Sequence, residues 1–183
     1  MVKRKGFTLI EMLIVASVFL IVFIFSLGGL RTNRRLSEFR LAIDRVAAET
    51  RQAQTMALTG VSDEVVESIA YGIYFDESSP WQYLIFKDTN SDNNYDLADE
   101  AIKTVALPEE IIIAGVGPDE PEEITNLSVV FKPPRPTVYF NGLTSNNEAQ
   151  INLARVSISN KEGRVIVNRI TGRIIAELLN SEE

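Results

Sequence analysis

The chain has 183 residues, a length that accommodates one domain with an appendage. Hydrophobic residues make up 45% of it and charged residues 23%, so the composition permits a packed core. Cysteine and histidine are both absent, which excludes disulfides, thiolate nucleophiles, histidine bases and the usual zinc and haem ligands. A formal net charge of −7 argues against a generic nucleic-acid binder.

The N-terminal segment joins a basic block to a long apolar run. Lys3, Arg4 and Lys5 come first, and residues 7–30 then contain a single charged residue, Glu11. As a helix, the 19 uncharged residues 12–30 would cover about 28 Å, close to the hydrocarbon thickness of a bilayer. The run predicts a single membrane span, with the basic block cytoplasmic and the C-terminal domain outside.

Two ordinary interpretations of this segment leave something unexplained. A secretory signal peptide would have a shorter apolar region and an Ala-x-Ala-like cleavage site, which this sequence lacks. A plain membrane anchor does not explain Glu11, because a carboxylate in a membrane segment costs about 2.5–3.5 kcal/mol and usually has a partner or a function. Snorkelling from the helix start would lower that cost, so the anchor remains an alternative.

Residues 3–12 read Lys-Arg-Lys-Gly-Phe-Thr-Leu-Ile-Glu-Met. This string closely resembles the processing and methylation motif of type IV prepilins and type II secretion pseudopilins. The resemblance implies that a prepilin peptidase cleaves between Gly6 and Phe7 and that Phe7 is then N-methylated. It also implies that Glu11 pairs with the N-terminal amine of a neighbouring subunit. Removal of residues 1–6 would change the formal net charge from −7 to −10.

Residues 31–60 predict an amphipathic continuation of the same helix, because no proline occurs from residue 7 to residue 60. Polar residues such as Arg45 and Glu49 are expected on the other faces of this helix. Gly60 is expected to end it. The pair Gly28 and Gly29 is expected either to bend the helix or to provide a contact between small residues. Residues that are apolar or small, with the exceptions of Thr50 and Gln54, recur at steps of three and four and predict one packed helix face. The face consists of Leu36, Phe39, Ile43, Val46, Ala47, Thr50, Ala53, Gln54 and Ala57.

After residue 60 the sequence changes to short β-rich runs separated by turn formers. The last two runs predict a hairpin around Thr171 and Gly172. The fold class expected is α+β and pilin-like, a long N-terminal helix packed on a C-terminal antiparallel sheet domain. Its parts would be a leader (1–6), a membrane helix (7–30), an amphipathic helix (31–60) and a β-rich domain (61–183). Strands are expected over residues 69–75, 82–87, 102–107, 110–114, 127–131, 137–140, 149–159, 163–168 and 172–176.

Four local stretches resemble the GspH/FimT branch of minor pseudopilins and minor pilins, at residues 51–54, 81–90, 137–142 and 164–173. The resemblance implies a minor subunit of a type II secretion pseudopilus, or alternatively of a type IV pilus or competence system. It implies a prepilin peptidase, other pilins or pseudopilins, the inner-membrane assembly platform and membrane lipid as partners. The assembled protein would belong to a filament rooted in the cytoplasmic membrane.

Residues 88–100 are rich in aspartate and asparagine and follow the spacing of a calcium-binding loop. Asn93 stands where the template has glycine, and Asp99 where it has a glutamate that Glu100 could replace. The alternative is an acidic turn that binds nothing, since these residues are common turn formers. The candidate ligands, all with oxygen donors, are Asp88, Asn90, Asp92, Asn94, Asp96 and Asp99.

Basic residues gather near the C-terminus of an otherwise acidic chain. Some FimT-like minor pilins act in DNA uptake, and the resemblance to them therefore suggests a DNA contact for these basic residues. The negative overall charge of the chain opposes such a contact. The alternatives are solvated edge strands that resist aggregation, or contacts to acidic faces of other pilins. The residues are Arg155, Lys161, Arg164, Arg169 and Arg173.

The sequence contains no recognisable catalytic arrangement. Without histidine or cysteine, acid–base chemistry would depend on aspartate, glutamate, lysine or tyrosine. No glycine-rich phosphate loop and no Ser-x-x-Lys or Gly-x-Ser-x-Gly motif occurs. We therefore expect a structural protein and not an enzyme. A membrane-anchored module that binds calcium or another ligand is the alternative from a different class.

Overall fold

The computed structural model describes residues 6, 8–59, 69–118, 124–134, 137–156 and 161–180, without the side chains of residues 25–35, 118, 161 and 180. Within these described residues, one helix, α1 (Leu9–Thr59), precedes nine strands. The backbone of α1 is helical through Gly28 and Gly29, and Gly60 lies outside the described residues. The strands are β1 (Ala70–Asp76), β2 (Gln82–Asp88), β3 (Glu100–Ala106), β4 (Ile111–Pro118), β5 (Asn126–Lys132), β6 (Thr137–Phe140), β7 (Glu148–Arg155), β8 (Lys161–Asn168) and β9 (Ile174–Asn180).

All nine predicted strands are present, and three differ noticeably in length from the prediction. Strand β4 continues to Pro118, and β7 ends at Arg155, four residues earlier than expected. Strand β9 begins at Ile174 because Gly172 has a φ of 66° and belongs to the turn before it. The expected terminal hairpin is confirmed, since β8 and β9 pair antiparallel.

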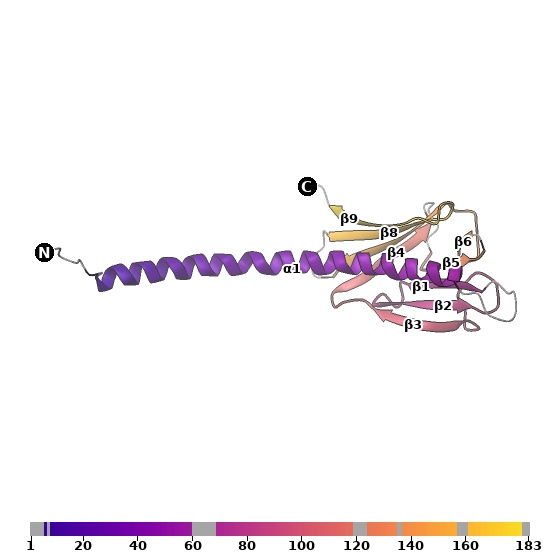
Figure 1. Ribbon diagram of the computed structural model, residues 1–183, viewed down its shortest axis with the longest axis horizontal. Coiled ribbons are helices and arrows are strands. Elements are labelled where there is room, and N and C mark those ends of the chain that lie inside the picture. The colour runs from indigo at the N-terminus through magenta and orange to yellow at the C-terminus, as the bar shows by residue number, and fades with distance from the viewer. Residues whose placement is uncertain are drawn as a thin grey trace. The chain divides into compact units, whose positions relative to one another are not determined.

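The strands form two antiparallel sheets, so the predicted α+β pilin-like fold class is confirmed. The five-stranded sheet has the order β3-β2-β1-β5-β6, and the four-stranded sheet has the order β4-β7-β8-β9. Chain contacts divide the protein into two compact units, Met1–Glu38 and Phe39–Glu183. The second unit therefore contains both sheets and the C-terminal part of α1, which Figure 1 shows between β1–β3 and β8–β9.

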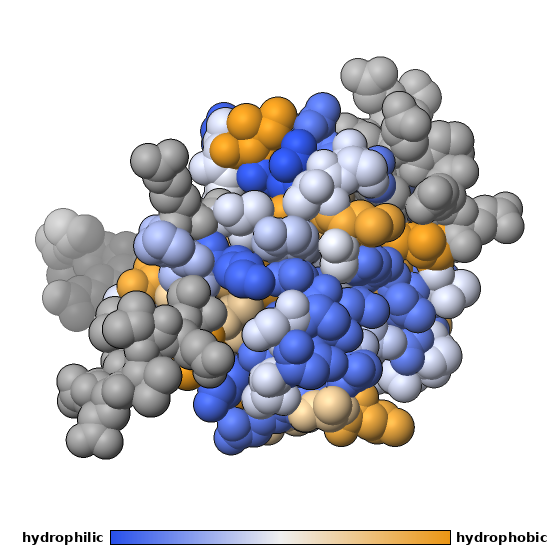
Figure 2. All heavy atoms as spheres, turned by 90° about the vertical axis from the view of Figure 1, so that its right-hand side faces the viewer, coloured by the Kyte–Doolittle hydropathy of each residue, from blue (hydrophilic) through white to orange (hydrophobic). Residues whose placement is uncertain are grey.

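Hydrophilic side chains cover most of the molecular face in Figure 2, with hydrophobic side chains at a few places between them. The apolar residues of the strands point inward instead. Strand β7 shows the pattern most clearly, since half-buried and buried residues alternate along all eight positions. This alternation is expected for a strand with one face on a core.

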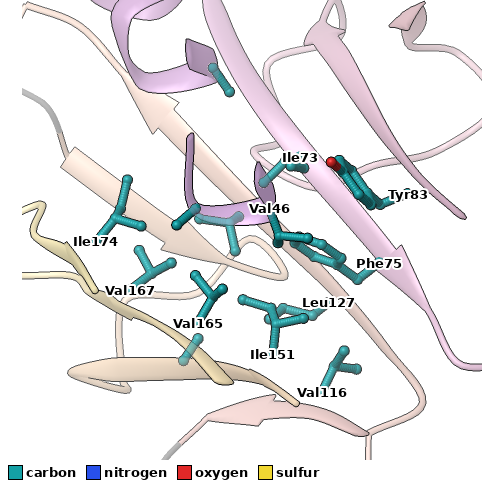
Figure 3. Close-up of a cluster of buried hydrophobic side chains, with 14 of the residues drawn as sticks. Val46, Ile73, Phe75, Tyr83, Val116, Leu127, Ile151, Val165, Val167 and Ile174 are labelled. Carbon is teal, nitrogen blue, oxygen red and sulfur yellow. The ribbon is translucent and has the colours of Figure 1, made fainter. Parts of the chain in front are cut away.

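The main core of the second unit combines α1 with the inner faces of both sheets. Figure 3 shows Val46 of α1 close to Ile73 and Phe75 of the five-stranded sheet, and Val165 and Ile151 of the four-stranded sheet. The predicted helix face is confirmed except that Leu36 and Gln54 are only half-buried; its other members are all buried.

Glu49 was expected on a polar face of the helix, and that expectation was wrong. It is only 9% exposed. Its carboxylate receives hydrogen bonds from Lys103 Nζ at 2.8 and 3.0 Å, a partner supplied by edge strand β3. A carboxylate can be buried at this position because a cation reaches it from another element.

A second, smaller core lies on the outer face of the five-stranded sheet. Phe86, Ala70 and Val130 are buried there. A Cβ on Gly72 would come within 2.5 Å of the Phe86 ring, so only glycine leaves room for that ring on β1. The half-buried residues that pack against this cluster are Tyr74, Leu84, Tyr95 and Tyr139.

Candidate functional site

The predicted cleavage position lies in exposed backbone ahead of the helix. Gly6 is exposed and not helical, and none of the other described residues comes within 4 Å of where a Cβ on it would be. Phe7 and leader residues 1–5 lie outside the described residues. Gly6 therefore precedes α1, which begins at Leu9.

Thr8 and Glu11 form hydrogen bonds with each other at the N-terminus of α1. Thr8 N donates to Glu11 Oε2 at 3.5 Å, and Glu11 N donates to Thr8 Oγ1 at 3.3 Å. This reciprocal pattern is a capping box, which satisfies backbone N–H groups at a helix start. The Glu11 carboxylate lies where the helix dipole favours negative charge, and it is exposed, so another cation can approach it.

The first turns of α1 present apolar side chains on every face. From Leu9 to Ile24 all residues are exposed, and the large hydrophobic ones are 46–83% accessible. A helix that is apolar all round needs lipid or other helices around it. Residues 25–30 of the predicted membrane helix have no described side chains. Among the described residues, no helix has the length and apolar character that crossing a membrane requires.

The Asp/Asn loop, residues 88–99, runs from the last residue of β2 to β3 and brings three predicted ligands together. Asp88, Asp92 and Asp99 each place a carboxylate oxygen within 4.8 Å of the other two. Asn90 Nδ2 donates to Asp92 Oδ2 at 3.2 Å and to Asp96 Oδ2 at 3.1 Å. Asn94, another predicted ligand, donates its backbone N–H to Asp92 Oδ1 at 2.8 Å. Asn93 has a φ of 61°, the left-handed conformation expected at the glycine position of the template.

Asp88 is the buried member of this group, with 4% exposure. Burial raises the pKa of its carboxyl above the ordinary value, and the nearby Asp99 and Asp92 raise it further. Hydrogen bonds from the backbone N–H groups of Asn93 and Ser91 act in the opposite direction. A buried carboxylate between two others is a group that a divalent cation would stabilise.

Tyr95 attaches the Asp/Asn loop to the small outer core, an arrangement that sequence reasoning missed. Its ring centroid lies 4.6 Å from that of Tyr74 and 5.0 Å from that of Phe86. Its backbone N–H donates to Ser128 Oγ at 3.1 Å, and Ser128 N donates to Asn141 Oδ1 at 2.6 Å. An aromatic residue inside a polar loop was the available signal, because such a ring needs apolar cover.

The predicted basic residues do not form one free positive surface. Arg155 is buried and its Nε donates to Glu110 Oε2 at 3.0 Å, while Arg164 pairs with Glu177 at 2.9 Å. Arg169 donates to the carbonyl of Asn146 at 2.7 Å. Arg173 is exposed, and the side chain of Lys161 lies outside the described residues.

Arg51 and Gln54 bind the turn between β8 and β9, a contact that the sequence did not predict. An Arg51 guanidinium N–H donates to the carbonyl of Ile174 at 2.8 Å, and Gln54 Nε2 donates to the carbonyl of Gly172 at 3.0 Å. These bonds join residues 123 and 118 positions apart. Two of the four stretches that carry the GspH/FimT resemblance therefore touch each other.

Comparison with known proteins gives one match. Residues 1–27 match the family model described as the prokaryotic N-terminal methylation motif. No curated protein and no solved structure matches the chain. The match covers the segment that holds Gly6, Thr8 and Glu11.

Proposed function

Because the chain is a type IV prepilin-like protein, we propose that it serves as a minor subunit of a type II secretion pseudopilus. The methylation motif at residues 1–27 is the observation that carries this proposal. The motif implies processing by a prepilin peptidase and assembly with other pilins. The exposed apolar start of α1 supports the proposal, since such a surface must be covered by lipid before assembly and by neighbouring helices after it.

In this proposal, Glu11 sets the register between subunits. Cleavage after Gly6 would expose the amine of Phe7 as a new cation. A carboxylate in a surrounding of low polarity binds such a cation strongly. The Thr8–Glu11 capping box supports the idea, because it holds the carboxylate at the helix start while leaving it exposed.

Intact mass tests the processing step directly. The full chain is co-expressed with a prepilin peptidase and compared with Gly6→Ala under the same conditions. We expect the loss of residues 1–6 and the gain of one methyl group on Phe7, both abolished in Gly6→Ala. A chain that stays intact beside a peptidase that cleaves another prepilin in the same cells would refute filament membership and favour an anchored module.

Glu11→Ala tests the assembly step. We expect normal insertion and cleavage, with incorporation into filaments reduced at least about tenfold, which corresponds to about 1.4 kcal/mol. Asp44→Ala, an exposed site on the same helix, is the matched control and should incorporate normally. Normal incorporation of Glu11→Ala would remove the charge-pairing role.

The four short stretches resemble minor pseudopilins and minor pilins alike, so they support a minor subunit, and gene deletion decides between the machines. Two of these stretches contact each other, since Gln54 Nε2 donates to the carbonyl of Gly172. Deletion of the gene should reduce secretion of folded exoproteins and leave surface piliation and DNA uptake unchanged. The reverse pattern would assign the chain to a pilus or competence machine.

We also propose that the Asp/Asn loop binds calcium through Asp88, Asp92 and Asp99. The carboxylate oxygens within 4.8 Å of one another favour it, because an oxygen-only ligand set suits calcium. Calcium should raise the unfolding temperature of the full chain, with a smaller effect from magnesium. Asp92→Asn should abolish the calcium effect and Asp44→Asn should preserve it; an equal response of both variants would contradict the site.

A further inference from the structure

A small cleft lies on the outer face of the five-stranded sheet and has no part in assembly or in the candidate calcium site. Its volume is about 220 Å³. Tyr74, Leu84 and Thr104 line it, and they are direct neighbours across β1, β2 and β3. Tyr95 of the Asp/Asn loop also lines it, with its ring 4.6 Å from that of Tyr74. The cleft therefore has apolar groups from three strands and one loop.

Apart from Tyr83, the rest of the lining is polar. Asp76 and Ser79 belong to the end of β1 and the turn after it, and Gln82 begins β2. A carboxylate, a primary amide and the hydroxyl groups of Ser79 and Thr104 thus lie around one space. Together they offer several hydrogen-bond donors and acceptors but no positive charge.

We propose that this cleft binds a single neutral sugar ring, as a free monosaccharide or as one unit of a glycan. A pyranose has an apolar C–H face and a rim of hydroxyl groups. Tyrosine rings accept the apolar face, while the Asp76 carboxylate and the Gln82 amide can each bind adjacent hydroxyls. A drug-sized ligand occupies about 300–1,000 Å³, so 220 Å³ suits a smaller molecule of this size.

Other ligand classes fit the lining less well. An anion would meet the Asp76 carboxylate, and no lysine or arginine lies among the lining residues. A lysine ammonium has donors only, so it could pair with the Asp76 carboxylate but would leave the amide and hydroxyl donors around it unused. A purely apolar ligand would make no use of the hydrogen-bonding groups of Asp76, Ser79, Gln82 and Thr104.

Saturation-transfer difference NMR on the full chain tests this assignment. The detergent must lack a sugar headgroup, because a maltoside or glucoside would compete for the cleft. The probes are glucose, galactose, mannose and N-acetylglucosamine, each titrated to about 50 mM, a range that covers weak millimolar affinity. Lysine methyl ester is the cationic probe and inorganic phosphate the anionic one.

Two variants examine the cleft, each with a matched control. Asp76→Asn keeps the oxygen that accepts Ser78 N at 2.8 Å but removes the charge, and Asp44→Asn is its control on the helix. Thr104→Phe should fill the cleft, whereas Ile102→Phe changes an exposed residue of the same strand outside the cleft. Unfolding temperatures of all four variants verify that they fold.

We expect saturable binding of at least one sugar. Asp76→Asn and Thr104→Phe should each weaken its affinity about tenfold or more. Both controls should bind as the wild type does. Absence of binding to every sugar, binding that Thr104→Phe leaves unchanged, or preference for lysine methyl ester or phosphate would overturn it. Thr104→Phe keeps the test decisive if Asp76→Asn fails to fold.

Discussion

Ile43 of α1 fills the space that a side chain on Gly163 of β8 would occupy. A Cβ built on Gly163 would overlap Ile43 Cδ1 and would also lie 3.2 Å from the carbonyl oxygen of Glu177. Both residues are buried, so neither can move toward solvent. The helix therefore reaches the four-stranded sheet at this point because residue 163 has no side chain.

Gly163→Ala should lower the free energy of unfolding of the globular unit by about 2 kcal/mol, the usual effect of overpacking a core. Chemical denaturation of the full chain in detergent measures this. In an Ile43→Val background the penalty should be smaller, because the overlapping methyl group is gone. Gly115→Ala is the control, since its nearest neighbour is the Asn152 side chain at 3.4 Å; equal penalties at both glycines would contradict the contact.

Lys103 should matter for stability because its Nζ, 2.8 Å from Glu49 Oε1, is the nearer of two cations at a nearly buried carboxylate, with Arg45 Nε at 4.0 Å. Lys103→Met should destabilise the fold by about 1–2 kcal/mol, less than for a fully buried pair because the lysine side chain is 44% exposed. Replacing both partners, with Glu49→Leu added, should recover most of the loss. Lys87→Met serves as control, since Lys87 is 3.7 Å from Glu100 in an exposed pair and should change stability by less than about 0.5 kcal/mol.

The Tyr83 hydroxyl is buried and, among the described residues, has no hydrogen-bond partner. Burial, together with the nearby Glu49 carboxylate, raises the pKa of Tyr83. Tyr83→Phe should therefore leave the free energy of unfolding unchanged or raise it by up to about 1 kcal/mol. Denaturation of the variant at neutral pH measures this, and a loss above about 1 kcal/mol would show that the hydroxyl has a stabilising partner.

The raised pKa of Asp88 predicts how the stability of the calcium-free protein depends on pH. Burial raises the pKa of Asp88, so the folded state holds its proton more tightly than the unfolded chain does. Its contribution to stability is complete below about pH 4 and is lost as pH rises through the raised value. Asp88→Asn should remove this loss, measured as the difference in unfolding free energy between about pH 4 and pH 7.

Calcium should reverse that dependence, because an ion bound by carboxylates requires their deprotonated form. With calcium present, the wild-type protein should become more stable as pH rises from about 4 to 7, while Asp88→Asn should not. Asp44→Asn is the control and should follow the wild type. A wild-type pH profile that calcium does not alter would contradict the proposed site.

Local patterns in the sequence predicted most elements of this fold. Steps of three and four residues indicated the buried face of α1, and alternation indicated nine strands, because both periodicities follow from the geometry of a single element. The Asp/Asn spacing indicated the loop, and Asn93 has the left-handed conformation expected there. The motif around Gly6 and Glu11 is local too, which is why it could be recognised from residues 3–20 alone.

Contacts between distant residues depended on packing and could not be predicted in the same way. Nothing near Glu49 in the sequence indicates that Lys103 will neutralise it, and nothing near Arg51 indicates the carbonyl of Ile174. Strand β1 lies beside β5, and Tyr95 packs on Tyr74 and Phe86. These neighbours are chosen by the free energy of covering apolar surface and pairing buried polar groups, which belongs to the whole chain and to no single segment.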